Sequence, residues 1–182
     1  MPHTDHPAVA PVVLVIMGVS GCGKSTIAQL LSDRLGWPFE EGDSLHPPAN
    51  VAKMAAGHPL DDADRLPWLE KVAGWVEARL DSGGSGIITC SALKRSYRDL
   101  INRRGNGVEF VYLAGTRAEI AAQLAHRTGH FMPPSLLDSQ FAALEEPGAD
   151  EPAIRVGIGP EAPTVVRHIL DELGLSGSGA RL

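Results

Sequence analysis

Cysteine and long apolar runs are both scarce in this chain of 182 residues. The two cysteines, Cys22 and Cys90, do not have the spacing of a disulfide framework, so we expect two reduced thiols in a reducing compartment. The longest apolar run, Val12 to Met17, is far shorter than the roughly 20 residues that cross a bilayer. The N-terminus has no basic segment followed by an apolar stretch, so we expect no signal peptide. These features predict a cytoplasmic protein without a membrane partner.

Basic residues are outnumbered, because 16 lysines and arginines stand against 22 aspartates and glutamates, for a formal net charge of -6. A nucleic-acid-binding surface needs clustered cations that displace counterions from phosphates, so this balance argues against a nucleic-acid partner. It leaves room for a small anionic ligand, since a local pocket can be basic on an acidic protein. Hydrophobic residues make up 43% of the chain, enough for one buried core at this length.

Apolar runs typical of buried strands alternate with segments of helical periodicity, which is the pattern of a parallel sheet covered by helices. We expect a single α/β domain over residues 11–175, between a flexible leader at 1–10 and a flexible tail at 176–182. The expected strands are Val12–Met17, Pro38–Glu41, Gly86–Ser91, Val108–Ala114 and Ala153–Ile158. The expected helices are Lys24–Leu35, Pro48–Ala56, Arg95–Arg103 and two amphipathic stretches that include Leu69–Leu80 and Val165–Leu173.

A phosphate-binding loop (P-loop) is the strongest motif. Residues Gly18 to Ser25, GVSGCGKS, fit G-x-x-x-x-G-K-[ST] at every required position, between an expected strand and an expected helix. Glycines let successive backbone N–H groups face phosphates, and the helix N-terminus favours their negative charge. Lys24 is expected to reach the β- and γ-phosphates of ATP, and the Ser25 hydroxyl to ligate Mg²⁺. The expected nucleotide-binding residues are Gly18, Val19, Ser20, Gly21, Cys22, Gly23, Lys24, Ser25 and Thr26.

The P-loop alone does not separate kinases from other nucleotide-binding proteins. A GTPase would carry an N-K-x-D base-recognition motif, which this sequence lacks. Oligomeric ATPases usually end an apolar strand in an acidic residue, whereas the strand Gly86–Ser91 is followed by Ala-Leu-Lys. Small size, together with a Gly- and Pro-containing stretch at Arg127–Ser139 that we expect to form a lid loop, favours a small-molecule kinase. A nucleotide-gated module without catalysis is the alternative from another class.

The expected second strand leads into an acidic turn, Glu40-Glu41-Gly42-Asp43. Ligands of open parallel sheets bind at the carboxyl ends of strands, so Asp43 should face the same crevice as the P-loop. There its carboxylate can accept the proton of an acceptor hydroxyl. Glu41, on the same face of the strand, can hold Mg²⁺ through a bound water. The structural alternative is a solvated acidic turn that caps the next helix.

Longer motifs follow in order along the chain. They are Gly42-Asp43-x-Leu45-His46-Pro47, Asn50-x-x-Lys53-Met54, Gly57-x-Pro59-Leu60-x-Asp62-x-Asp64-Arg65-x-Pro67-Trp68-Leu69, Cys90-Ser91-Ala92-Leu93-Lys94-x-x-Tyr97-Arg98-Asp99, Arg127-x-Gly129-His130-Phe131-Met132 and Gln140-Phe141-x-x-Leu144-Glu145. In these blocks the sequence resembles the small, single-domain gluconate kinases throughout residues 12–173. The resemblance implies ATP-dependent phosphorylation of D-gluconate at the C6 hydroxyl. It also implies a P-loop fold like that of nucleoside monophosphate kinases, with a five-stranded parallel sheet, and a homodimer.

The same blocks contain residues suited to an anionic polyol. Gluconate carries one carboxylate and several hydroxyls, so its pocket needs fixed cations and hydrogen-bonding groups. Asp61 and Asp62 are expected to form a solvated loop and no metal site. The expected substrate-binding residues are Asp43, His46, Lys53, Arg65, Lys94, Arg98 and His130, of which Arg65, Lys94 and Arg98 supply cations.

A helical lid at approximately residues 123–145 is expected to bring Arg127 to the transferring phosphoryl group, as a catalytic residue beside Lys24 and Asp43. Lids of this family typically carry a second arginine one helical turn earlier, where this chain has Gln123. Arg117 and His126 are the candidates to replace that charge. A kinase for another small polyol acid, such as shikimate, is the alternative within enzymes.

Overall fold

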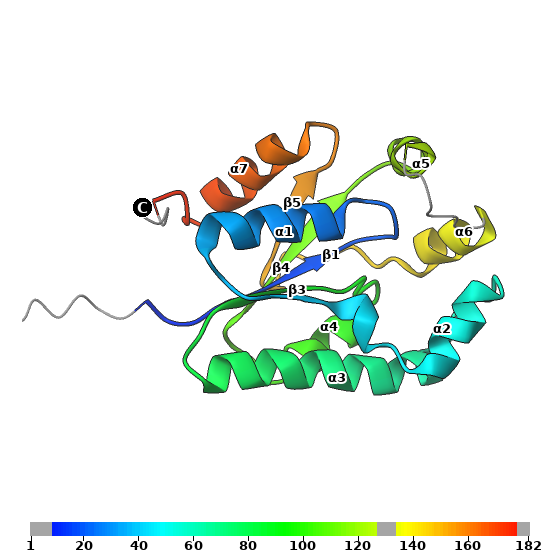
Figure 1. Ribbon diagram of the computed structural model, residues 1–182, viewed down its shortest axis with the longest axis horizontal. Helices are drawn as coiled ribbons and strands as arrows, with labels where there is room; N and C mark the ends of the chain where they lie inside the picture. Colours follow the sequence, from blue (N-terminus) through cyan, green and yellow to red (C-terminus); the bar gives the residue numbers. More distant parts are fainter. Residues whose placement is uncertain (1–8, 127–133, 178–182) are drawn as a thin grey trace, which may run out of the picture.

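The computed structural model describes residues 9–126 and 134–177, in which a five-stranded parallel sheet lies between two layers of helices (Figure 1). The strand order is β2-β3-β1-β4-β5, so β1, which leads into the P-loop, is central. This is the sheet that the sequence predicts, and the predicted strand limits agree to within two residues. The strands are β1 (Val13–Met17), β2 (Phe39–Glu41), β3 (Gly86–Thr89), β4 (Val108–Ala114) and β5 (Ala153–Gly157).

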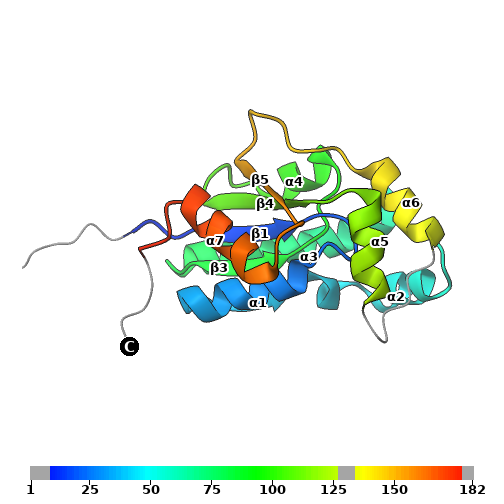
Figure 2. The same ribbon diagram turned by 90° about the horizontal axis from the view of Figure 1, so that it is seen from above.

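Helices cover both faces of the sheet and one of its ends. In Figures 1 and 2, α1 and α7 lie on one face and α3 and α4 on the other, whereas α2, α5 and α6 gather at the end where the strands finish. No helix in the described part of the chain is long and apolar enough to cross a membrane. The helices are α1 (Lys24–Leu35), α2 (Pro48–Ala55), α3 (Asp62–Asp81), α4 (Arg95–Ile101), α5 (Arg117–Ala125), α6 (Pro134–Ala143) and α7 (Ala162–Glu172), with a 3₁₀ turn η1 (Gly42–Leu45).

Two apolar clusters fill the space between the sheet and its helices. Along β1, Leu14 and Ile16 belong to the cluster under α1 and α7. Val13, Val15 and Met17 belong to the cluster under α3 and α4. Successive side chains of a strand point to opposite faces, so a strand buried on both faces must be apolar throughout, as β1 is. The backbone pairing of β1 with β3 and β4 fixes its register and therefore the position of the P-loop that follows it.

The stretch Arg127–Ser139, expected as a loop, is partly helical. Helix α6 begins at Pro134, so the second half of that stretch belongs to the helix. Proline suits this position, because its fixed φ fits the first helical residue and its missing N–H has no partner there. Leu136 and Leu137 are buried, so this helix packs on the core. The two adjacent prolines made the helix hard to recognise from the sequence.

Candidate active site

The P-loop connects the buried strand β1 to helix α1. Gly18, Gly21 and Gly23 adopt positive φ angles of 144°, 85° and 96°, which side chains rarely tolerate. A Cβ at Gly18 would lie 2.8 Å from the Cys22 Sγ and 3.0 Å from the Leu113 carbonyl oxygen, so the loop is packed closely against β4. The N-cap of α1 is Gly23, which has no side chain to occupy the N–H groups of the first turn. These N–H groups are therefore available to an anion.

Lys24 lies over this loop. Its side chain is buried, and its Nζ donates hydrogen bonds to the carbonyl oxygens of Gly18 and Val19, each at 3.1 Å. Ser25 and Thr26 follow in the first turn of α1, and both are exposed. The ammonium thus lies against two carbonyl oxygens of the loop, and the two hydroxyl residues follow it in the first turn of α1.

Asp43 lies in η1, directly after a backbone position that is fixed from three sides. The Gly42 N–H donates to the Thr89 Oγ1 at 3.0 Å, and the Trp68 Nε1 donates to the Gly42 carbonyl at 2.8 Å. A Cβ at Gly42 would lie only 1.8 Å from the Thr89 carbonyl oxygen, so only glycine fits there. Glu41, one residue earlier, accepts a hydrogen bond from the Thr89 Oγ1 at 2.5 Å. The strands β2 and β3 therefore hold the acidic turn in one position.

Cys90, which follows β3, is affected by the charges of three predicted site residues. The residue is buried, and this burial raises the pKa of its thiol to about 12. Asp43 also raises that pKa, whereas Lys24 and Arg65 lower it. The charges of Asp43, Lys24 and Arg65 thus all act on the same buried thiol. Cys22 is buried as well.

His46 packs face to face against Trp68, with ring centroids 4.0 Å apart. Its Nδ1 lies 3.2 Å from the Asn50 amide nitrogen, which also donates to the Asp64 carbonyl at 2.8 Å. An amide nitrogen can only donate, so Nδ1 is the acceptor and Nε2 carries the proton of the neutral ring. Burial lowers the pKa of His46, with a smaller opposing effect from Asp43. The neutral imidazole can therefore offer Nε2–H to a hydroxyl.

A cavity of about 270 Å³ opens on the Asp43 side of the sheet. The Arg65 Nη1 donates to the Tyr97 hydroxyl at 3.1 Å, and the Lys94 Nζ pairs with Asp62 at 3.0 Å. Asp62 also accepts a hydrogen bond from Tyr97, which with Lys94 lowers the pKa of its carboxyl. The cavity is lined by Pro59, Leu60, Asp61, Asp62, Arg65, Lys94, Ser139 and Ala143.

The expected solvated loop at Asp61 and Asp62 is more ordered than the sequence suggests. Asp61 is the N-cap of α3, and its carboxylate accepts the Asp64 N–H at 2.7 Å, in a reciprocal capping box. Asp62 is exposed but paired with Lys94 and Tyr97, as described above. Among the described residues, no group of three or more His, Cys, Asp or Glu side chains is arranged to hold a metal ion.

Two predicted substrate residues have structural partners instead. The Arg98 side chain is 1% exposed, and all three guanidinium nitrogens donate hydrogen bonds, to Glu151 and to the carbonyls of Ala92 and Leu93. This guanidinium therefore holds the loop after β3 and does not line the acceptor cavity. Lys53 pairs with Asp64 at 2.6 Å and ties α2 to α3. Arg127 and His130 lie outside the described residues.

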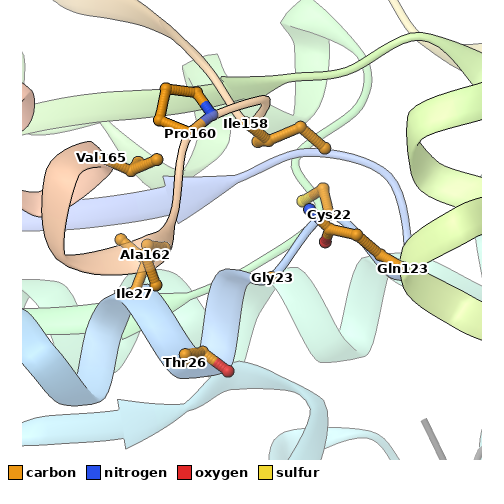
Figure 3. Close-up of a pocket in the computed structure, with 9 residues that line it drawn as sticks. All are labelled: Cys22, Gly23, Thr26, Ile27, Gln123, Ile158, Pro160, Ala162 and Val165. Carbon is orange, nitrogen blue, oxygen red and sulfur yellow. The ribbon is translucent and has the colours of Figure 1, made fainter. Parts of the chain in front are cut away.

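A second cavity, of about 200 Å³, lies on the other side of the P-loop. Figure 3 shows Ile158 and Pro160 on one side of it, Thr26 and Ile27 of α1 on another, and Gln123 reaching in from α5. Cys22 and Gly23 of the P-loop form its floor beside Gln123. Sequence reasoning singles out the P-loop residues, Thr26 and Gln123 but not the apolar wall, which comes largely from residues 158–165 after β5.

Several residues of the site are not singled out by sequence reasoning. Tyr97 orients Arg65, Trp68 supports both His46 and Gly42, and Thr89 joins Gly42 to Glu41. Gln140 of α6 contacts the P-loop, where it accepts the Ser20 N–H at 2.6 Å. Tyr97, Trp68 and Gln140 all occur in the family-specific sequence blocks, and their presence there is the signal that could have identified them as site residues.

Comparison with known proteins agrees with this geometry. The family model for shikimate kinase matches residues 20–146. The gluconokinase of Gluconobacter oxydans is 52% identical over 171 residues, covering 94% of both chains. A gluconokinase structure from Sinorhizobium meliloti superposes with a TM-score of 0.83 at 42% identity, covering 90% of this chain and 92% of that chain. An unliganded sugar kinase from Janibacter gives a TM-score of 0.85 at 42% identity, over 94% and 99% of the two chains. The chain, with its shikimate-kinase-like P-loop domain, belongs to the gluconokinase family.

Proposed function

We propose that the protein transfers the γ-phosphoryl group of ATP to the C6 hydroxyl of D-gluconate, giving 6-phospho-D-gluconate and ADP. The observation that carries this proposal is a cavity lined by two cations, in a chain that also has a P-loop and an exposed carboxylate, Asp43, directly after the strand β2. Arg65 and Lys94 supply the cations. A substrate with a hydroxyl at one end and a carboxylate at the other matches this arrangement. The gluconokinase relatives support the same assignment.

On the nucleotide side, the triphosphate lies on the N–H groups of the P-loop and of the first turn of α1. Lys24 exchanges its hydrogen bonds to Gly18 and Val19 for the β- and γ-phosphates. The Ser25 hydroxyl and, through a water, Glu41 would hold Mg²⁺, which needs only one or two protein ligands because phosphates and waters complete its shell. When bound, Mg²⁺ would offset the negative charge of the phosphates.

Chemistry at the acceptor begins with Asp43. Its carboxylate accepts the C6 hydroxyl proton while the hydroxyl oxygen bonds to the γ-phosphorus. The bond from that phosphorus to the β–γ bridging oxygen breaks, and ADP leaves with the electron pair. Lys24 and Arg127 stabilise the charge on the transferring group. Phosphate found anywhere but C6 would contradict this role for Asp43.

The acceptor carboxylate is held by Arg65 and Lys94. Lys94 is already paired with Asp62, so binding exchanges one carboxylate for another on the same ammonium. Tyr97 keeps its place between the two cations, 5.6 Å from the Arg65 guanidinium carbon and 5.7 Å from the Lys94 Nζ, measured to the ring centre. The His46 Nε2–H is available to donate a hydrogen bond to a hydroxyl of gluconate. Lys53 and Arg98 act on the fold and not on the substrate.

The adenine base is assigned to the second cavity. This space adjoins the P-loop at Cys22 and Gly23, and its other walls are largely apolar, which suits a flat heterocycle one ribose away from the phosphates. Gln123 is the long polar side chain at its edge. The two cavities share no lining residue, and we assign one to the donor and the other to the acceptor.

A coupled assay for 6-phosphogluconate, run with ATP and Mg²⁺ over a panel of sugar acids and sugars, tests the proposal. Glucose lacks the carboxylate, so it leaves the cations of the pocket without a partner, at a cost of several kcal/mol. We expect about 10³-fold lower kcat/KM for glucose than for gluconate. Comparable values would contradict a carboxylate-reading pocket.

A kinase for shikimate is the second candidate, because the shikimate kinase family model spans residues 20–146. The same panel decides between them, since shikimate is a cyclic acid and gluconate an open chain. Preference for shikimate would favour this second candidate and leave the phosphate chemistry unchanged.

We also propose that the protein works as a cytoplasmic homodimer, on the strength of its family, and without a nucleic-acid or membrane partner. Sedimentation of the purified chain at several concentrations measures the oligomeric state directly. A monomer at all concentrations that retains full activity would contradict a required dimer.

A further inference from the structure

Helix α6 makes a two-point contact with the P-loop. The Gln140 Oε1 accepts the Ser20 N–H at 2.6 Å, and the Gln140 Nε2 donates to the Ser20 Oγ at 2.8 Å. One amide thus uses both of its polar ends on one residue of the loop, 120 positions away in sequence. Two hydrogen bonds of this kind fix the orientation of the loop as well as its distance from the helix. The Ser20 N–H is engaged by protein before any phosphate arrives.

The same helix lines the acceptor cavity. Ser139, adjacent to Gln140, and Ala143, one turn further on, both contribute to the wall of that cavity. In Figure 1, α6 lies at the end of the sheet between the P-loop and the segment that carries α2. The helix therefore contacts the acceptor space and the phosphate loop at neighbouring positions.

Packing makes α6 move as a unit. Leu136 and Leu137 are each 8% exposed, and Phe141 packs against the cluster that also contains Val19 and Cys22 of the P-loop. Arg117 of α5 lies over the Phe141 ring, with its guanidinium carbon 5.2 Å from the ring centre. A displacement of this helix consequently changes the acceptor wall and the Gln140–Ser20 contact together.

We propose that Gln140 is a positioning residue that couples occupancy of the acceptor cavity to the shape of the P-loop. An acceptor that fills the cavity restrains α6 through Ser139 and Ala143, and Gln140 passes that restraint to Ser20. The P-loop is then already ordered when the nucleotide binds, so each ligand strengthens the binding of the other. This inference rests on the proposed function for the identity of the two ligands.

Titration calorimetry on the full chain tests the coupling. The dissociation constant of gluconate is measured alone and with a saturating, non-hydrolysable ATP analogue and Mg²⁺, and the reciprocal experiment is run with gluconate saturating. We expect the wild type to show a coupling of about fivefold or more, equal in both directions as linkage requires. In Gln140→Met, which keeps length and helix propensity but loses both hydrogen bonds, the coupling should fall below about twofold.

A matched control is Gln29→Met. Gln29 is an exposed glutamine of α1 that bonds only locally, to Asp33 at 2.9 Å, and its replacement should leave the wild-type coupling intact. Ser20→Ala removes the hydroxyl acceptor but keeps the backbone N–H, so an intermediate coupling is expected. This variant decides the matter if Gln140→Met does not fold.

Equal coupling in the wild type and in Gln140→Met, or no coupling in the wild type, would overturn the inference. Failure of the proposed function gives a different result, in which the wild type neither binds nor phosphorylates gluconate. The coupling is then measured with the acid that the acceptor panel identifies.

Discussion

At the level of single residues, the acceptor side holds two carboxylates with different surroundings. Asp43 is exposed and follows the rigidly held Gly42. Asp62 accepts a hydrogen bond from Tyr97 and pairs with Lys94, and these two contacts lower the pKa of its carboxyl. In the proposed function, Asp43 would take a proton from the acceptor, whereas Asp62 would compete with the acceptor carboxylate for Lys94.

Replacement of Asp43 by asparagine should remove the proton acceptor and keep the shape of the site. We expect Asp43→Asn to lower kcat by about 10²- to 10⁴-fold, with little change in gluconate affinity. Steady-state kinetics with calorimetric measurement of gluconate binding checks both parts. Asp33→Asn, the same change at an exposed position of α1, is the control and should behave as the wild type. Near-normal turnover in Asp43→Asn would remove Asp43 from the chemical step.

Replacement of Asp62 by asparagine should free Lys94 for the substrate. The pair is largely exposed, with 66% of the Asp62 side chain accessible, so solvent weakens it and a substrate can replace it. We therefore expect Asp62→Asn to lower the KM for gluconate by up to about fivefold and to leave the KM for ATP unchanged. Asp81→Asn removes the same charge from the other end of α3 and should change neither KM. A raised KM in Asp62→Asn would mean that Asp62 orients Lys94 and does not compete for it.

At the level of elements, α4 carries two arginines that pair with the segment before β5. Arg95 pairs with Asp150, and Arg98 pairs with Glu151, each at 2.6 Å. The first pair has side chains 47% and 65% exposed, whereas the second has 1% and 5%. The same two elements thus offer an exposed and a buried ion pair of similar length, and only the buried one fixes the loop that leads to Lys94.

We expect Arg98→Met to lower the free energy of unfolding by about 3–5 kcal/mol, because it leaves the Glu151 charge buried without its partner. Arg95→Met, which breaks an exposed pair, should lower it much less. Denaturant titration of both variants measures the difference. A loss in Arg98→Met no larger than that in Arg95→Met would contradict a structural role for Arg98.

The KM values of Arg98→Met and Lys94→Met for gluconate distinguish a structural role from a role in substrate binding. Folded Arg98→Met should keep a KM for gluconate within about threefold of the wild type, since its effect is not on bound substrate. Lys94→Met should raise that KM by about tenfold or more, through loss of a charged hydrogen bond. If Arg98→Met raised the KM as much as Lys94→Met, the initial expectation of Arg98 as a carboxylate-binding residue would be restored.

At the level of the whole molecule, the stability conferred by the buried pair depends on pH. Arg98 lowers the pKa of Glu151 from its ordinary value of 4.5, chiefly through its hydrogen bond. A depressed carboxyl pKa contributes stability that is complete above the unfolded-state value and is lost as pH falls through the folded-state value. The difference in free energy of unfolding between the wild type and Arg98→Met should therefore be largest at neutral pH and should decrease below about pH 4.5. Unfolding measured from pH 7 to pH 3 tests this, and a difference that is constant or grows in acid would contradict it.

The sequence determined the fold and the donor half of the site, because both depend on local pattern. A run buried on both faces of the sheet makes β1, and the glycines at 18, 21 and 23 permit the positive φ angles of the P-loop that follows. Chain order then places Lys24 and Ser25 at the start of α1. Asp43 was predictable as well, because it follows a strand whose end lies at the edge where ligands bind.

Only the tertiary structure decided which of the remaining cations face the acceptor. Lys94 and Arg98 lie four residues apart in the same sequence block, yet Lys94 lines the cavity and Arg98 is buried against Glu151. The contact of Gln140 with Ser20 likewise joins residues 120 positions apart. The physical reason is that a charged side chain pairs with an oppositely charged group nearby in space, and the packing of distant segments determines which group that is. Local sequence pattern fixes where an element begins and which face is apolar, but it does not fix which carboxylate a given arginine meets.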